Sequence, residues 1–86
     1  MKVKISSPLQ SYTNGLREIE VDKTTLNELL DELDRQFPGI KFRFIDEQDK
    51  VRRHMRIFVN GEIIDNIFIP LKTGSEVFIV HMISGG

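Results

Sequence analysis

The sequence predicts an α+β fold in which one main helix packs on a mixed sheet of four to five strands. Segments that alternate apolar and polar residues, typical of half-buried strands, occur near both ends of the chain. Between them, one segment repeats apolar residues every three or four positions, which is typical of an amphipathic helix. With 86 residues, 40% of them hydrophobic, we expect a single domain over residues 1–86.

The chain begins with two expected strands. Lys2 to Ser7 alternates until Pro8 stops the pattern, and Leu16 to Val21 alternates again. The loop between them contains Asn14-Gly15, a common turn sequence. The two segments therefore predict an antiparallel hairpin.

The main helix is expected over Asp22 to Phe37. Thr25 with Glu28 three residues later resembles a capping box, and Pro38-Gly39 ends the pattern. Five apolar residues form one face of this helix: Leu26, Leu29, Leu30, Leu33 and Phe37.

The second half is less regular. Ile40 to Val51 predicts a short irregular segment, with a one-turn helix as an option, and a charged loop. Met55 to Asn60 predicts a strand, and Glu62 to Ile64 a short partner across the Asn60-Gly61 turn. Glu76 to Ile83 predicts the last strand.

This order of elements has few compact solutions. A lone hairpin buries too little apolar surface to be stable, so the helix must cover one face of the sheet. A crossover through the helix places the first and last strands side by side and parallel at the centre. The prediction is a β-grasp, or ubiquitin-like, fold.

Several function classes are excluded by the composition. A net charge of −1 gives no general attraction for nucleic acid or membranes, and no run reaches the roughly 20 apolar residues of a membrane span. There is no cysteine, and His54 and His81 lack metal-ligand spacing, so we expect no metal site and a cytoplasmic location. Neither a phosphate-binding glycine loop nor a nucleophile motif is present, which argues against an enzyme.

One basic cluster has two interpretations. It is either a docking patch for an acidic partner or phosphate, or a solvated loop balanced by Asp46, Glu47 and Asp49 just upstream. The second is favoured, because neighbouring opposite charges weaken the field. The cluster consists of Lys50, Arg52, Arg53, His54 and Arg56.

The last strand is apolar on both faces, which a strand packed on one side does not require. We expect one set of side chains to face the helix: Ile57, Val59, Val77 and Ile79. The opposite face then carries an exposed apolar patch that suits a partner: Phe58, Phe78, Val80 and Met82. The alternative is that the segment Phe42–Ile45 folds over this patch.

After the last strand come Ser84, Gly85 and Gly86. Two glycines form a thin thread without side chains, so the tail is expected to enter a narrow slot on a partner and present the Gly86 carboxylate there. The alternative is a frayed or truncated end.

These features resemble the MoaD/ThiS family of ubiquitin-like sulfur carriers over nearly the whole chain. The similar segments are the helix start Thr24–Leu30, the strand and turn Ile57–Glu62, the segment Leu71–Val77 and the Gly85-Gly86 end. The first loop and the segments Phe37–Ile40 and Asp46–Arg53 resemble the CysO-like branch. Val80-His81-Met82 replaces the proline usual in molybdopterin-synthase small subunits, and the first loop lacks their arginine and glutamate.

The resemblance implies a carrier, not an enzyme. A separate ubiquitin-activating-type adenylyltransferase/sulfurtransferase, using ATP and Mg, would adenylate Gly86 and convert it to a thiocarboxylate. Ser84 and Gly85 would thread the tail, and no cofactor would be bound by this chain. Sulfur would then pass to an acceptor enzyme, either cysteine synthase-like or the molybdopterin synthase large subunit. In the CysO-like branch a metalloprotease would release the adduct.

Other functions remain open at this point. The chain could be a molybdopterin synthase small subunit, a thiamin-type sulfur carrier, or a ubiquitin-like modifier that joins Gly86 to lysines. A different class is an interaction module in which the glycine end has no role.

Overall fold

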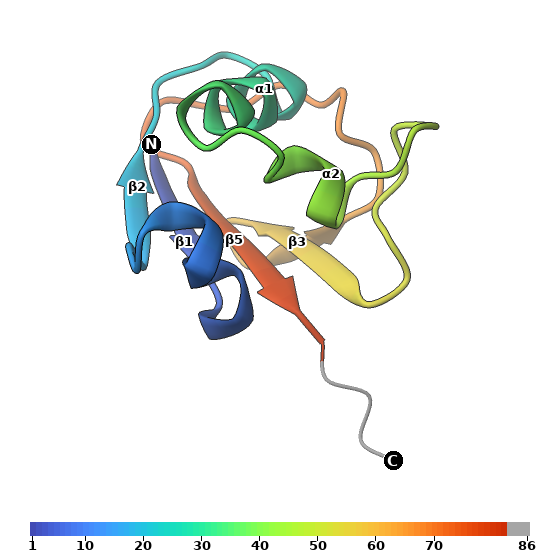
Figure 1. The fold of residues 1–86 in the computed structure, drawn as a ribbon. Helices are drawn as coiled ribbons and strands as arrows, with labels where there is room; N and C mark the ends of the chain where they lie inside the picture. Colours follow the sequence, from blue (N-terminus) through green and yellow to red (C-terminus); the bar gives the residue numbers. More distant parts are fainter. Residues whose placement is uncertain (83–86) are drawn as a thin grey trace.

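The computed structural model describes residues 1–82, so the predicted end of the last strand at Ile83 lies outside the described part (Figure 1). Within residues 1–82 the chain forms five strands, two α-helices and a 3-10 helix, η1. In chain order these are β1 (Lys2–Ile5), η1 (Ser7–Thr13), β2 (Glu18–Glu20), α1 (Leu26–Gln36), α2 (Lys41–Phe44), β3 (Met55–Val59), β4 (Glu62–Ile64) and β5 (Glu76–His81).

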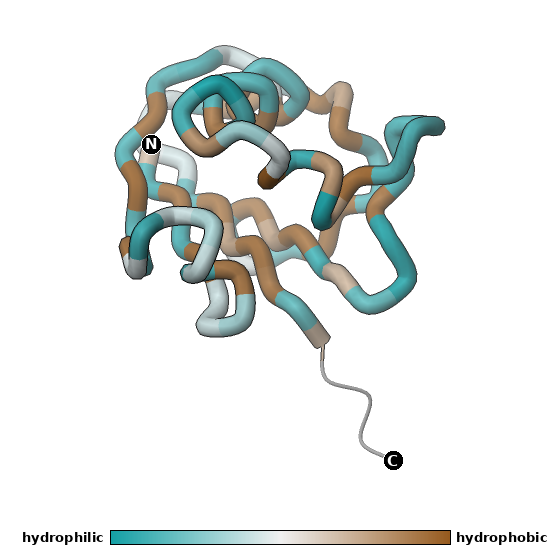
Figure 2. The backbone as a smooth tube through the Cα atoms, in the orientation of Figure 1, coloured by the Kyte–Doolittle hydropathy of each residue, from teal (hydrophilic) through white to brown (hydrophobic). Residues whose placement is uncertain are grey.

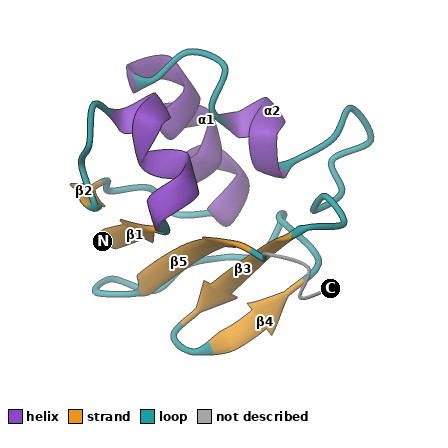
Figure 3. Ribbon diagram, turned by 60° about the horizontal axis from the view of Figure 1, so that its bottom comes forward, coloured by secondary structure: helices purple, strands orange, loops and turns teal. Residues whose placement is uncertain are grey.

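The five strands form one sheet with the order β2-β1-β5-β3-β4. β1 and β5 are parallel at its centre, with Val3 opposite Val77 and Ile5 opposite Ile79, and the other pairs are antiparallel. Both α-helices lie on one face of this sheet (Figure 3). The mixed sheet with its helix is the predicted β-grasp fold.

Helix α1 has the predicted cap at Thr25, although it begins at Leu26 and not at the expected Asp22. The Thr25 hydroxyl caps the helix by accepting a hydrogen bond from the Glu28 backbone N–H at 3.2 Å. The Glu28 carboxylate accepts in turn from the Thr24 and Thr25 hydroxyls, and these bonds hold the pKa of Glu28 below its usual value. Such a cap stabilises a helix by about 1 kcal/mol.

The core lies between the helices and the sheet, where the apolar residues of the facing elements meet (Figure 2). The predicted helix face is buried, except that Phe37 is half-buried against the core. The predicted inner face of the central strands is also buried, except that Val59 is half-buried. The largest fully buried side chains include Phe44, Leu26, Leu29, Leu30, Leu33, Ile40, Ile57, Ile67 and Ile79.

Two segments differ from the simplest expectation. Residues 7–13 form η1 where a loop was expected; Pro8 stands in its first turn, where the missing N–H costs nothing. The Ile40–Val51 region contains the one-turn helix α2, and its Phe44 and Ile45 are buried in the core. None of the helices within residues 1–82 has the length and apolar composition that crossing a membrane requires.

Neighbouring residues on β5 test the two faces of the sheet. Ile79 has no exposed surface, so Ile79→Ala should lower the free energy of unfolding by about 2–5 kcal/mol through lost burial and a cavity. Phe78 lies on the other face and is 40% exposed. Phe78→Ala should therefore lower the free energy of unfolding by about 1 kcal/mol or less. Urea denaturation measures both, and equal losses would contradict the assigned faces.

Candidate functional site

The outer face of the sheet, opposite the helices, carries the predicted apolar residues. Phe58 of β3 lies directly opposite Phe78 of β5, and residues paired in this way point to the same face. Val80 lies two residues further along β5 and is half-buried, whereas Met82, beyond the strand end, is 45% exposed.

One residue of this surface was not predicted from the sequence pattern. Ile63 of β4 pairs with Phe58, which places it on the same face, and it is 56% exposed. We call Phe58, Ile63, Phe78, Val80 and Met82 the outer patch. Only the register across the Asn60-Gly61 turn identifies Ile63, because Ile63 and Ile64 are both apolar and adjacent in sequence.

The segment Phe42–Ile45 does not cover the outer patch. Phe44 and Ile45 are buried in the core, on the side of the sheet where both helices lie (Figure 3). Phe42 is 59% exposed and packs under Arg52, whose guanidinium carbon lies 4.4 Å from the ring centre. The alternative in which this segment shields the patch is therefore wrong.

The end of β5 is anchored from both sides. The Ser6 backbone N–H donates to the Ile79 carbonyl at 3.0 Å, and the Ser6 hydroxyl accepts from the His81 N–H at 2.9 Å. On the other side, the Met82 N–H donates to the His54 carbonyl at 2.6 Å. The strand is thus held to its last described residue, while the predicted tail residues Ser84, Gly85 and Gly86 lie outside the described part.

The predicted basic cluster lies beside this anchored end, since Met55 pairs with His81. The Asp46 carboxylate accepts hydrogen bonds from the backbone N–H groups of Lys50 and Gln48, and these hold its pKa below the usual value. Within residues 1–82, no carboxylate forms an ion pair with Arg52, Arg53 or Arg56. The acidic residues just upstream were expected to offset the positive charge of this cluster, but they do so without forming ion pairs with these arginines.

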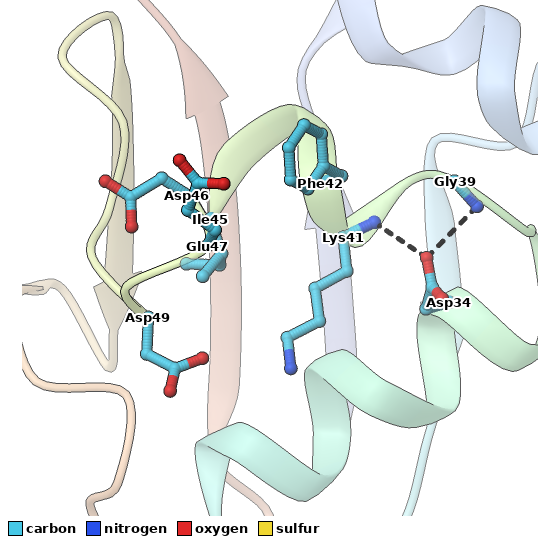
Figure 4. Close-up of a pocket in the computed structure, with 8 residues that line it drawn as sticks. All are labelled: Asp34, Gly39, Lys41, Phe42, Ile45, Asp46, Glu47 and Asp49. Atoms are coloured by element: carbon cyan, nitrogen blue, oxygen red, sulfur yellow. Dashed lines mark hydrogen bonds between the residues drawn. The ribbon is translucent and has the colours of Figure 1, made fainter.

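A hollow of about 300 Å³ lies between the end of α1 and the loop after α2 (Figure 4). Asp34 contributes a carboxylate oxygen that accepts from the backbone N–H groups of Gly39 and Lys41, both at 3.1 Å. Asp46, also in its lining, is engaged by backbone as described above. These carboxylates hold loops in place, so their role is structural.

The described residues offer no metal centre: no group of three or more His, Asp or Glu side chains in residues 1–82 is placed to hold an ion. Together with the absence of cysteine, this leaves the outer patch, the basic cluster and the end of β5 as the features of interest.

Known proteins share both the sequence pattern and the fold. Residues 3–86 match the model of the ThiS family. The sulfur carrier protein CysO of Mycobacterium tuberculosis (strain ATCC 25618 / H37Rv) is 27% identical over 93 aligned residues that span all of both chains.

Two solved structures illustrate the similarity in fold. The crystal structure of the Amycolatopsis orientalis BexX/CysO complex contains a chain that is 27% identical, with a TM-score of 0.90 over 99% of this chain and 98% of that one. SAMP1 from Haloferax volcanii is 24% identical, with a TM-score of 0.77 over 99% and 97% of the two chains, and shares the fold.

The anchored strand end gives a prediction. Ser6→Ala removes the acceptor of the His81 N–H, so exchange of that amide with solvent should be about 3- to 10-fold faster, as expected for the loss of one hydrogen bond. Ser7→Ala is the control, because the Ser7 hydroxyl makes no hydrogen bond within the described chain. Amide exchange followed by NMR measures both, and equal exchange at His81 in the two variants would show that the Ser6 hydroxyl is not an anchor.

Proposed function

The chain belongs to the ThiS family, and from this premise we propose that it is a sulfur carrier whose Gly86 carboxylate becomes a thiocarboxylate. The observation that carries the proposal is the family match over residues 3–86, which includes the Gly85-Gly86 pair. The full-length similarity to CysO sulfur carriers supports it. In this proposal the folded domain is a handle and the reaction takes place at the tail.

The proposed reaction has two steps on a separate activating enzyme. A Gly86 carboxylate oxygen attacks the α-phosphorus of ATP, with Mg, and pyrophosphate leaves. Hydrosulfide then attacks the acyl carbon of the adenylate, AMP leaves, and one oxygen of Gly86 has been replaced by sulfur. Adenylation is needed because a free carboxylate has no good leaving group. The carrier itself needs no cysteine.

The outer patch would hold the enzymes that act on the tail. Its aromatic and aliphatic side chains lie on the same strand, β5, that leads into the tail, so a partner seated on the patch has the tail within reach. Exposed apolar surfaces of this kind suit partner binding. The hydrogen bonds that join the end of β5 to Ser6 and the Met82 N–H to the His54 carbonyl would keep the strand straight while the tail enters a slot.

The proposed acceptor follows the CysO-like similarity. The thiocarboxylate sulfur would displace the leaving group from the β-carbon of an activated serine on a cysteine synthase-like enzyme, forming a carbon–sulfur bond. Hydrolysis of the adduct by a metalloprotease would then give cysteine and return the Gly86 carboxylate. That a CysO chain has been crystallised in complex with BexX supports docking with a partner protein. No cofactor is proposed for this chain.

Gly86 is tested by mass. With the activating enzyme of the same organism, ATP and sulfide, the intact chain should gain about 16 Da, the difference between sulfur and oxygen. Gly86→Ala or deletion of Gly86 should abolish the gain with the fold intact, because an alanine side chain would not fit the proposed slot and a tail one residue shorter would not reach its reactive end.

Methionine oxidation adds nearly the same mass, so the control is a thiol-reactive alkylating reagent. The chain has no cysteine, and the reagent should therefore label only the thiocarboxylate. A Gly86→Ala chain that still gained an alkylatable group would contradict the proposal. Conjugates of higher mass joined to lysines of other proteins would indicate the modifier function instead.

Docking is tested by a matched pair of phenylalanines. Phe78→Ala should lower kcat/KM for thiocarboxylate formation by about 10- to 30-fold, the loss typical of an apolar anchor at an interface. Phe68, 58% exposed in the loop after β4, lies outside the outer patch, and Phe68→Ala should leave kcat/KM unchanged. Steady-state kinetics with the carrier as varied substrate measures both, and equal effects would argue against docking through the patch.

A further inference from the structure

Five of the six arginines gather at the end of the molecule where β5 ends. The Arg17 carbonyl accepts from the Ile5 N–H at the end of β1, and Arg52, Arg53 and Arg56 surround the start of β3, which pairs with the end of β5. Arg43 stacks on Tyr12 of η1, with its guanidinium carbon 4.9 Å from the ring centre. The sixth, Arg35, is near the end of α1.

None of these five guanidinium groups has a carboxylate partner in the described chain. The ion pairs of residues 1–82 involve only Arg35, three lysines and the terminal amine. Arg56 donates to the Arg53 and Met55 carbonyls, and Arg52 donates to the Phe42 carbonyl at 2.7 Å. The guanidinium groups of Arg52 and Arg56 are therefore held in place, and none of the five forms an ion pair within the described residues.

Four of these five arginines line two hollows on either side of β5. One hollow, on the β1 side, is lined by Lys4, Ser6, Arg17 and Phe78. The other, on the β3–β4 side, is lined by Arg52, Arg53, Arg56 and Ile63, with Asp65 as its one carboxylate. Each hollow thus includes a member of the outer patch, so the positive charge and the apolar surface form one continuous area.

We propose that the partner which takes the tail has an acidic surface around its slot, and that the four arginines lining these hollows guide and orient the carrier on it. The proposal rests on the proposed function and specifies the chemistry of the partner. Guanidinium groups bind carboxylates through paired hydrogen bonds, and complementary charges around an apolar contact speed association. A protein partner is favoured over a nucleic-acid duplex, because a duplex presents phosphates and no apolar surface to the centre of this area, and the chain as a whole has a net charge of −1.

The test uses thiocarboxylate formation by the full chain with the activating enzyme of the same organism. Arg17 and Arg53 are exposed, and their guanidinium groups make no hydrogen bond within residues 1–82, so Arg17→Gln with Arg53→Gln should fold normally. At about 50 mM salt this double variant should raise KM about tenfold with kcat unchanged. At about 500 mM salt, where charges are screened, its KM should approach that of the wild type.

The matched control removes two positive charges at the opposite end of the sheet. Lys23 follows β2 and Lys72 precedes β5, and neither forms an ion pair within the described residues. Lys23→Gln with Lys72→Gln should leave KM within about twofold of wild type. Arg17→Lys with Arg53→Lys keeps both charges and should stay within about threefold.

The outcomes separate the two proposals. If the wild-type chain forms no thiocarboxylate, the proposed function fails and the inference fails with it. If it does, and the arginine and lysine double variants have the same KM, only the inference is overturned. Salt-sensitive binding of a DNA duplex that requires Arg17 and Arg53, with KM unaffected by their loss, would also overturn it in favour of a polyanion.

Discussion

The parallel pairing of β1 with β5 is the constraint on which the rest of the structure depends. It places the last strand at the centre of the sheet, with β1 on one side and β3 on the other, so both neighbours can hold its end. The Ser6 hydroxyl extends this pairing beyond β1, and the His54 carbonyl does the same from the other side. The chain therefore leaves the domain from a rigid position.

Side chains alternate along β5, so its two faces have different roles. Val77 and Ile79 are buried under the helices, whereas Phe78 on the other face is part of the outer patch. Because β1 is polar on that face, with Lys2 and Lys4 in ion pairs to Glu18 and Glu76, the apolar surface is confined to β5, β3 and β4. A partner on this surface would contact the strand that leads directly into the tail.

Most of the fold could be predicted, because the signals were local. The Thr25 cap and the leucine spacing mark the helix, and alternation marks the strands. The missed features depend on how the strands pair. Ile63 joins the patch only through its register with Phe58, and Arg17 joins the other arginines only because β1 and β5 bring residues 17 and 53 to one end. Sequence proximity also suggested that Asp46 offsets the arginines. Asp46 forms no ion pair with them, but after its backbone hydrogen bonds the nearby charge of Arg52 also lowers its pKa.

The central claim is that sulfur is carried on the terminal carboxylate, and locating the sulfur tests it most directly. The chain would be purified from its own cells, alkylated with a thiol-reactive reagent and fragmented intact in a mass spectrometer. The account predicts that the label lies only in fragments that contain residues 83–86. A label confined to fragments from residues 1–82, or its absence from the alkylated chain, would contradict the account.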